Sequence, residues 1–381
     1  MTASPISDLT LLFVTGTRAD YGKVEPLALA ARADGHRVIF FVTGMHMMHQ
    51  YGLTKKEVHR GNRFEVIEFP NQSDGDAQEL ILAKTITGFS DCVQDLHPDL
   101  VVVHGDRVEA LACSLVCATN YIRCAHVEGG EVSGTIDEIF RHCNTKLAWT
   151  HLVSSKEAAR RVRRLGESPQ SVHVIGSPEL DIHCQPSGID LDQVIKRYDI
   201  ATKEYGICTF HPVTSEQDNI AAQAQALFDA LETSKRYFVV IMPNNDPGSK
   251  IINSRIAKLP RNQFRVLPSM RFHYFSELMK NAKAIVGNSS VGVREAPFTG
   301  IASLDIGTRQ SNRSQASSVY GARAEETDKI LQFLNDNWGV RFTSDRSFGK
   351  GSATQSFTTL LKSPTFWTPP FQKSFYEDDT P

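Results

Sequence analysis

Residues 104–137, HGDRVEALACSLVCATNYIRCAHVEGGEVSGTID, follow directly on the apolar run LVVV at 100–103. A short apolar run of this kind is typical of a buried strand. A helical segment comes next, and then a second strand at 123–127. Polar side chains stand beyond both strands and at the start of the following helix: Asp106, Arg107, Glu128 and Asp137. The carboxyl ends of the strands form the ligand-binding edge of an open α/β sheet, so we predict a ligand site there.

Strand-like and helix-like runs alternate along almost the whole chain, which predicts an α/β fold with parallel sheets. The alternation pauses at 185–203, where Pro, Ser and Gly precede a short helix. We therefore predict two Rossmann-like doubly wound domains that face each other across a cleft. The first domain is placed at 1–186 and the second at 187–364. The aromatic tail, 365–381, is expected to pack back on the first domain.

The composition fits a soluble globular protein, with 41% hydrophobic and 22% charged residues among 381. A net charge of -2 argues against a nucleic-acid partner. The polar N-terminus lacks a basic segment, and no apolar run is long enough to cross a membrane, so we expect a cytoplasmic protein. The seven cysteines form no CxxC pair, which predicts reduced thiols.

Three carboxylates of the opening stretch allow two interpretations. Asp106, Glu128 and Asp137 come from separate elements, and like charges brought together raise the pKa of at least one group, as acid/base chemistry requires. Alternatively, these acids cap helices and pair with nearby arginines, a serious alternative for Asp137. The neighbouring histidines show no HxH or HExxH spacing, so we predict no metal site.

Two further segments are candidates for binding an anion. TGTRADYGK, 15–23, leaves a strand through glycine and carries Arg18 and Lys23 at the opening of a helix. Its alternative is an ordinary turn with surface cations. VGNSSVGVREA, 286–296, offers backbone N–H groups and two hydroxyls to a diphosphate. Its alternative is a helix cap. The binding residues predicted in this second segment are Ser289, Ser290 and Glu295, the last as an acceptor for ribose hydroxyls.

Strand ends in the second half of the chain carry more polar residues. The loop GTRQSNR, 307–313, presents two guanidinium groups, which suit phosphate, although an exposed basic loop explains them equally well. The residues predicted to contact the ligand from these strand ends are Arg309, Arg313, His211 and Asn244. A structural hydrogen-bonding role is the alternative for His211.

Nine motifs, in chain order, resemble the UDP-N-acetylglucosamine 2-epimerases. They are TGTRADYGK, TGMHMM, HGDR, HVEGGEVSGTIDEIFRH, GSPELD, FHPVT, PNNDPG, VGNSSVGVREAP and DIGTRQSNR. The resemblance is to the hydrolysing branch, which makes N-acetylmannosamine for sialic acid synthesis. Relatives that return UDP-N-acetylmannosamine typically have HVEAGLRT where this chain has HVEGGEVSGT.

The resemblance implies a glycosyltransferase-B-like fold, a UDP-sugar substrate, and neither a metal nor another cofactor. The positions that match the nucleotide contacts of the family are Arg18, Arg107, His211, Asn244, Ser289, Ser290, Glu295 and Arg309. Asp106, Glu128 and Asp137 match its proposed catalytic acids. We hypothesise that Asp137 and Glu128 move protons while Asp106 orients or assists. His46 and His126 are candidates for contacting the sugar, with structural support as the alternative.

Other functions remain open on the sequence alone. Some relatives hydrolyse a UDP-2,4-diacetamido-2,4,6-trideoxyglucose by the same mechanism. A glycosyltransferase of the same fold, or a UDP-sugar-binding module without catalysis, is a more distant alternative. The resemblance also implies a homo-oligomer, a dimer or a tetramer.

Overall fold

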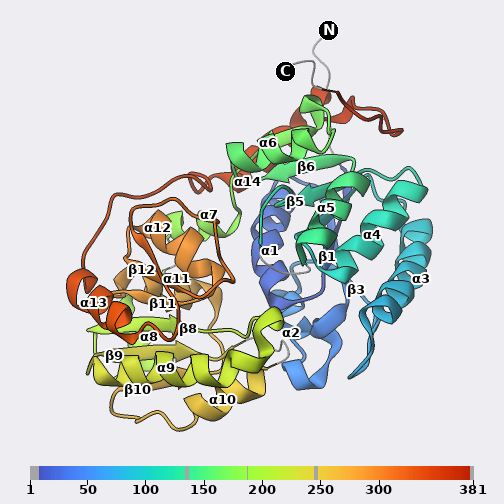
Figure 1. Cartoon of the computed structure of the whole chain (residues 1–381). Helices are drawn as coiled ribbons and strands as arrows, with labels where there is room; N and C mark the ends of the chain where they lie inside the picture. The colour runs from blue at the N-terminus through green and yellow to red at the C-terminus, as the bar shows by residue number, and fades with distance from the viewer. Residues whose placement is uncertain (1–7, 134–136, 187, 244–247, 378–381) are drawn as a thin grey trace. The chain divides into compact units, whose positions relative to one another are not determined.

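The protein is described by a computed structural model that covers residues 8–133, 137–186, 188–243 and 248–377. The chain divides into two compact units. Unit 1 contains the chain up to Glu131, the chain from helix α5 (Asp137–Leu147) to Asp181, and the chain from Ser347 onward; unit 2 contains Ile182–Arg346. Each unit is a parallel sheet with helices on both faces (Figure 1).

The sheet of unit 1 has seven parallel strands in the order β3-β2-β1-β4-β5-β6-β7. Its central strands are buried on both faces, which explains why they are continuous apolar runs rather than alternating ones. The strands are β1 (Thr10–Thr15), β2 (Arg37–Val42), β3 (Glu65–Glu68), β4 (Leu100–His104), β5 (Cys124–Val127), β6 (Thr150–Val153) and β7 (Val172–Val174).

Two helical layers cover the sheet of unit 1. Helices α1 and α14 lie on one face of the sheet, and α3 and α4 lie on the other (Figure 1). Phe13 of β1 packs in the first layer, and Leu12, on the opposite face of the strand, packs in the second. The helices, with α5 given above, are α1 (Arg18–Ala33), α2 (Lys55–Val58), α3 (Gln78–Leu96), α4 (Val108–Thr119), α6 (Lys156–Arg164) and α14 (Ala353–Lys362); α7 (Glu179–Cys184) leads into unit 2.

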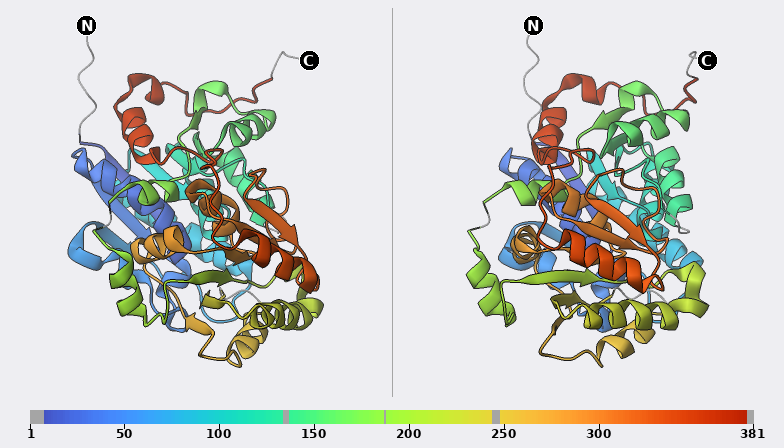
Figure 2. Two further views of the ribbon diagram at one scale, coloured as in Figure 1. Left: turned by 90° about the vertical axis from the view of Figure 1, so that its left-hand side faces the viewer. Right: turned by 60° about the vertical axis from the view of Figure 1, so that its left-hand side comes forward.

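The C-terminal segment packs on unit 1, and its return begins at Ser347 rather than at 365. The sequence did not predict α14, which places Phe357 against Phe13 at a ring-centroid distance of 6.3 Å. Beyond α14 the chain runs along unit 1 past α6 (Figure 2). There the Lys373 ammonium donates to the carbonyl oxygens of Lys146 (2.9 Å) and Ala148 (2.7 Å). The tail thus satisfies carbonyl groups at the C-terminal end of α5.

The sheet of unit 2 has six parallel strands in the order β10-β9-β8-β11-β12-β13. The strands are β8 (Tyr205–Thr209), β9 (Tyr237–Ile241), β10 (Phe264–Leu267), β11 (Ile285–Gly287), β12 (Ser303–Ile306) and β13 (Val319–Ala322). The last of these was not predicted, because the exposed Tyr320 and a glycine interrupt its apolar pattern.

Helices also cover both faces of the second sheet. One apolar layer includes residues of α9, α10 and α13, and the opposite layer includes residues of α8, α11 and α12. The helices are α8 (Leu191–Tyr198), α9 (Ile220–Thr233), α10 (Ser249–Ile256), α11 (Phe272–Asn281), α12 (Ala296–Thr299) and α13 (Thr327–Asn337).

Both sheets are doubly wound, which confirms the predicted fold class of each unit. Strand order reverses between β1 and β4 in unit 1 and between β8 and β11 in unit 2. A ligand of a doubly wound sheet binds beyond the carboxyl ends of the strands at such a reversal. The two reversal points therefore define where a site in each unit is expected.

Candidate functional site

At the reversal point of unit 1, the turn between β1 and α1 brings Arg18 and Lys23 into position. Thr17 caps α1, its hydroxyl accepting from the Asp20 N–H at 3.2 Å. This cap sets Arg18 as the first residue of the helix, where it forms an ion pair with Glu57. Lys23 lies one and a half turns later and reaches back to the carboxyl end of β5.

The turn after β4 carries the next two predicted residues. Gly105 has φ +70°, a conformation that costs glycine little, and it turns the chain away from the strand. Asp106 forms an ion pair with Arg141 of α5. Arg107 precedes α4, and its Nε lies 3.4 Å from the Glu109 carboxylate. The Arg141 contact fixes the direction of the Asp106 side chain, a quarter of which remains exposed (26%).

Glu128 is the centre of a buried polar cluster. It has φ +63°, which is uncommon for a residue other than glycine and turns the chain sharply at the end of β5. Its Oε2 accepts from Lys23 Nζ at 2.9 Å and from His104 Nε2 at 3.1 Å. Its Oε1 accepts from the Ser177 hydroxyl. A buried carboxylate is stable only when its charge is paired in this way.

His104 links Glu128 to a second carboxylate. Its Nδ1 lies 3.4 Å from Asp20 Oδ1, while its Nε2 bonds Glu128. Burial alone would lower the pKa of His104, but the contacts with the two carboxylates outweigh burial and raise it to about 9. Burial likewise opposes ionisation of Asp20, yet the His104 contact leaves the pKa of Asp20 below its usual range. The pair is therefore an imidazolium and a carboxylate at neutral pH.

His46 and His126 lie deep in the same unit. His46 contacts the hydroxyls of Thr15 (2.9 Å) and Thr54 (2.7 Å), and burial lowers its pKa to about 4. His126 donates from Nε2 to the carbonyl of Gly105 at 2.7 Å, and burial lowers its pKa to about 3. Both rings are neutral and brace the loops that hold the charged residues.

Asn288 organises the reversal point of unit 2. Its Oδ1 accepts from the His211 N–H at 2.7 Å, and its Nδ2 donates to the His211 carbonyl at 2.8 Å. Its own carbonyl accepts from Arg309 Nη1 (3.2 Å) and Gln310 Nε2 (3.0 Å). This one side chain and carbonyl thus tie together the loops after β8, β11 and β12.

The two serines that follow Asn288 are partly exposed, and Glu295 is buried. Gly287, with φ +141°, packs so closely that a side chain there would collide with the carbonyl of Thr209. After Ser289 and Ser290 the chain forms one π-helical turn, Val291–Glu295, a widened geometry that is common at functional sites. Glu295 closes this turn and accepts from His183 Nε2 at 2.7 Å.

The acid Asp305 lies at the end of β12. Burial raises its pKa to about 7, and the nearby positive charges of Arg313 and Arg309 oppose that rise. Arg313 itself donates to the side chain of Gln310 at 2.7 Å. The buried acid and the two arginines therefore belong to the same polar region at the sheet edge.

The structure brings most of the predicted residues together within each unit. In unit 1, Lys23 meets Glu128 directly, and Asp106 and Arg107 follow the neighbouring strand β4. In unit 2, His211 and Arg309 both bond Asn288. Asn244 lies outside the described residues. Asp137 opens α5, and its side chain is likewise outside the description.

Several polar residues of the site were missed by the sequence interpretation. Asp20 carries no spacing signal, since its contact with His104 joins loops after two different strands. Glu179 lies 3.1 Å from Lys23 and so adds a second carboxylate to that cation. Glu109 is buried against Gly16 and Gly44, glycines whose missing side chains leave room for it. His104 stands where the apolar run 100–103 ends, in the stretch that opens the sequence analysis, but it was not among the predicted site residues.

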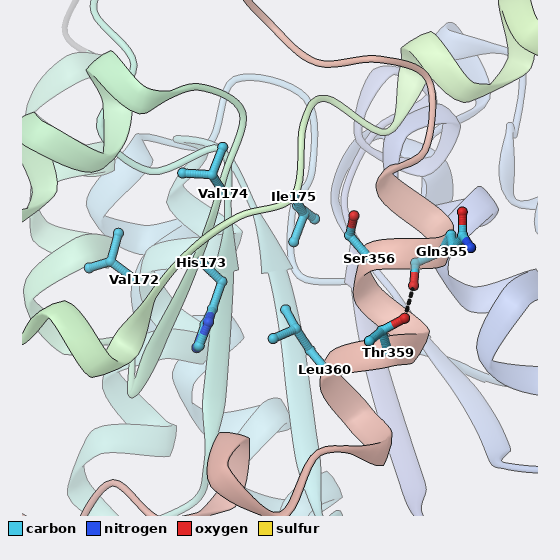
Figure 3. Close-up of a pocket in the computed structure, with 8 residues that line it drawn as sticks. All are labelled: Val172, His173, Val174, Ile175, Gln355, Ser356, Thr359 and Leu360. Atoms are coloured by element: carbon cyan, nitrogen blue, oxygen red, sulfur yellow. Dashed lines mark hydrogen bonds between the residues drawn. The ribbon is translucent and has the colours of Figure 1, made fainter.

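Other features of the described residues set limits on the site. Within that part of the chain, no group of three or more His, Cys, Asp or Glu side chains is arranged to hold a metal ion. Among its helices, none is both long and apolar enough to cross a membrane. A hollow of about 510 Å³ opens in unit 1 between β7 and α14 (Figure 3), but it is lined by none of the predicted site residues.

The fold defines an α/β protein with clusters of polar side chains at two sheet-reversal points. Comparison with known proteins gives the family: residues 29–362 match the UDP-N-acetylglucosamine 2-epimerase family model. The chain belongs to the UDP-N-acetylglucosamine 2-epimerase family, as the sequence motifs indicated.

Individual relatives cover nearly the whole chain. A UDP-N-acetylglucosamine 2-epimerase of Neisseria meningitidis serogroup B is 40% identical over 96% of this chain and 98% of its own. The hydrolysing UDP-N,N'-diacetylbacillosamine 2-epimerase of Legionella pneumophila is 29% identical over 92% of this chain and 95% of its own. The solved structure of a Neisseria meningitidis UDP-GlcNAc 2-epimerase, 18% identical, covers 93% of this chain and 100% of its own with a TM-score of 0.78. This likeness confirms the glycosyltransferase-B-like fold class.

Proposed function

We propose that this chain is a hydrolysing UDP-N-acetylglucosamine 2-epimerase, which converts UDP-N-acetylglucosamine and water to N-acetylmannosamine and UDP. The observation that carries the proposal is the Glu128 cluster, a buried carboxylate bonded to Lys23, His104 and Ser177 at the reversal point of unit 1. It occurs in a chain that belongs to the epimerase family, and such a cluster is suited to proton transfer.

Gly129 supports the hydrolysing branch. The segment 126–130 is HVEGG, where non-hydrolysing relatives typically have HVEAG. A methyl group on Gly129 would lie 2.9 Å from His126 Nδ1 and 3.1 Å from Thr145 Oγ1. An alanine there requires His126 or its surroundings to move. Because His126 braces Gly105, the change would also disturb the turn that carries Asp106.

The chemistry starts with departure of UDP. The hydrogen on carbon 2 of the sugar is not acidic, because no carbonyl is attached to that carbon. The bond from carbon 1 to the diphosphate oxygen therefore has to break ahead of proton removal, leaving positive charge at carbon 1. Loss of the carbon 2 proton then forms the double bond of 2-acetamidoglucal. Water adds next, with a proton to carbon 2 and hydroxide to carbon 1, which gives N-acetylmannosamine.

Unit 1 would supply the acid/base groups. We assign the proton transfers at carbon 2 to Asp137 and Glu128, and we assign orientation to Asp106. The His104 imidazolium, 3.1 Å from Glu128, stabilises that carboxylate in the ionised form that can accept a proton. Asp106, held by Arg141 and partly exposed, is suited to orient a ligand group.

Unit 2 would hold the nucleotide. The diphosphate is anionic, and backbone N–H groups, hydroxyls and guanidinium groups stabilise the charge that develops on it as it leaves. Asn288 gathers the loops that carry these donors. The donors and acceptors we assign to the nucleotide are His211, Asn244, Ser289, Ser290, Glu295, Arg309 and Arg313.

The Legionella pneumophila relative supports a second candidate. That protein is named for hydrolysis of UDP-N,N'-diacetylbacillosamine and is 29% identical to this chain. The same reaction on a 2,4-diacetamido-2,4,6-trideoxyglucose nucleotide requires an apolar wall for a 6-methyl group, where UDP-N-acetylglucosamine requires a polar partner for a 6-hydroxyl.

The test is incubation of the purified protein with each sugar nucleotide in deuterated water, followed by phosphorus and proton NMR. The proposal expects UDP and free N-acetylmannosamine with one deuterium at carbon 2. The amide variants Asp106→Asn, Glu128→Gln and Asp137→Asn should lose turnover or release 2-acetamidoglucal. Glu157→Gln, an exposed acid on α6, is the matched control.

Each contrary outcome identifies an alternative. UDP-N-acetylmannosamine without UDP release indicates the reversible epimerase. Turnover of the trideoxy sugar alone indicates the second candidate. Sugar release that depends on an added acceptor indicates a glycosyltransferase.

A further inference from the structure

The carboxylate of Glu295 is held by a histidine from a different part of unit 2. His183 lies near the end of α7, more than a hundred residues before Glu295 in the chain. Its Nε2 is 2.7 Å from Glu295 Oε2, and its Nδ1 is 2.8 Å from the hydroxyl of Ser276 on α11. The His183 side chain is fully buried, and that of Glu295 is only 6% exposed. Ser276 is also buried.

The chemistry of the carboxylate fixes the direction of the hydrogen bond between His183 and Glu295. An ionised carboxylate can only accept, so His183 Nε2 carries the hydrogen in its bond to Glu295. Nδ1 bonds the Ser276 hydroxyl, which can act as donor or acceptor. Ser276 therefore anchors the far side of the ring while Nε2 donates to Glu295.

Packing holds the imidazole in the plane that this bond needs. The ring of Phe272 lies 5.9 Å from that of His183, and the ring of Phe298 lies 6.4 Å from it. Phe298 follows Glu295 by three residues, so the segment that carries the carboxylate also packs on its partner. The π-helical turn Val291–Glu295 sets the carboxylate toward His183.

We propose that His183 is a positioning residue that makes Glu295 selective for the two ribose hydroxyls of the nucleotide. This inference rests on the proposed function, in which Glu295 accepts those hydroxyls. Each carboxylate oxygen has more than one lone pair, so the His183 bond leaves acceptor capacity for a ligand. One fixed edge of the carboxylate places the remaining lone pairs in one direction. The carboxylate can then accept hydrogen bonds from two adjacent hydroxyls at once, whereas a freely rotating carboxylate is less often in the orientation that accepts both.

A purely structural role is the competing explanation, since a buried acid needs a donor in any case. The two explanations differ in what they predict for sugar discrimination. A structural role predicts that loss of His183 weakens the fold and affects every ligand equally. A positioning role predicts a selective loss for ligands that carry both hydroxyls.

The experiment measures binding of UDP, 2′-deoxy-UDP and 3′-deoxy-UDP to the full chain by calorimetry. Hydrogen bonds to a charged acceptor are worth enough to give the wild-type protein about a ten- to hundredfold preference for UDP over either deoxy nucleotide. His183→Leu should reduce this preference to about threefold or less. His183→Gln keeps a donor near the Nε2 position and should restore most of it. Ile330→Val, which trims a fully buried side chain of the same unit, should keep the wild-type preference.

A double-variant cycle shows whether His183 acts through Glu295. If it does, the double variant His183→Leu with Glu295→Gln should show the same preference for UDP over the deoxy nucleotides as Glu295→Gln alone. In turnover assays, His183→Leu should raise KM about tenfold or more while kcat changes far less, since the ribose contact is present before and during the reaction. If His183→Leu does not fold, His183→Gln and Ser276→Ala carry the test, and Ser276→Ala is expected to lose part of the preference.

The outcomes separate this inference from the proposed function. A wild-type protein that binds no UDP overturns both. A wild-type protein that prefers UDP, with variants of His183 and Ser276 that keep that preference in full, overturns only the positioning role. An equal loss of affinity for all three nucleotides in the variants also overturns the positioning role and favours the structural explanation.

Discussion

Replacement of His104 by glutamine should remove a pH-dependent part of the stability of unit 1. The contacts with Asp20 and Glu128 raise the pKa of His104 to about 9 in the folded chain, against an ordinary value of 6.5. Because the folded pKa is the higher one, the folded state binds more protons than the unfolded state between these values. The stabilisation is therefore complete below about pH 6.5 and is lost as the pH rises through 9.

The size of this effect follows from the same values. At about 1.4 kcal/mol for each tenfold change in proton affinity, the difference corresponds to about 3 kcal/mol of unfolding free energy. The His104 side chain is only 9% exposed, so solvent screening reduces this figure little. The wild-type protein should lose up to about 3 kcal/mol between pH 6.5 and 9.5. His104→Gln should be less stable at pH 6.5 and should show little pH dependence over that range.

Urea unfolding followed by tryptophan fluorescence tests this prediction. The background variant Trp338→Phe leaves Trp149 and Trp367, both in unit 1, as the reporters. The exposed His49→Gln is the matched control and should follow the wild type at every pH. An equal fall in unfolding free energy in the wild type and His104→Gln would refute the reasoning, and so would a wild type with no fall at all.

Three other substitutions have defined outcomes. Gly129→Ala should lower the unfolding free energy, measured by urea unfolding, by about 1–3 kcal/mol, because the new methyl group lies 2.9 Å from His126 Nδ1. Unchanged stability would contradict this, since it would mean that the surroundings of residue 129 accept the methyl group. Asp181→Ala should lower the unfolding free energy by about 1–3 kcal/mol and speed proteolysis of the C-terminal segment. The reason is that the Asp181 carboxylate accepts from the N–H groups of Ala353 (2.9 Å) and Thr354 (2.8 Å) at the start of α14. Proteolysis at the wild-type rate would contradict this. Lys23→Met should lower kcat about a hundredfold or more while UDP still binds, because the change removes the ammonium that donates to Glu128 at 2.9 Å. A loss of UDP affinity as large as the loss of kcat would instead place Lys23 at the nucleotide.

The sequence predicted the features that follow from local pattern. Apolar runs followed by polar turns identified most strands of both sheets, and the positions just after those strands identified Lys23, Glu128 and Arg309 as polar residues of the sheet edges. These predictions succeed because a strand buried on both faces needs continuous apolar residues, and because its carboxyl end has to turn.

Contacts between distant parts of the chain could not be predicted in this way. The pairing of His104 with Asp20 depends on strand order, since β4 lies beside β1 only in the folded sheet. The bond from His183 to Glu295 joins residues more than a hundred positions apart. Helix α14 was missed because its apolar face, Phe357 and Leu361, is short. Those residues are explained only by their packing with α1 in the folded unit. The spacing of residues along the sequence does not indicate such contacts.

The two sheet edges differ in the polar groups that they carry, and the difference bears on the proposed reaction. The edge of unit 1 carries carboxylates that are paired with cations, as Glu128 is with Lys23 and Asp106 with Arg141. The edge of unit 2 presents hydroxyls and the guanidinium of Arg309 around Asn288. In the proposed reaction UDP departs ahead of proton transfer, so positive charge develops on the sugar ring while negative charge develops on the diphosphate. Carboxylates favour the first charge and N–H donors favour the second, so each unit carries groups suited to one of the two charges of the proposed reaction.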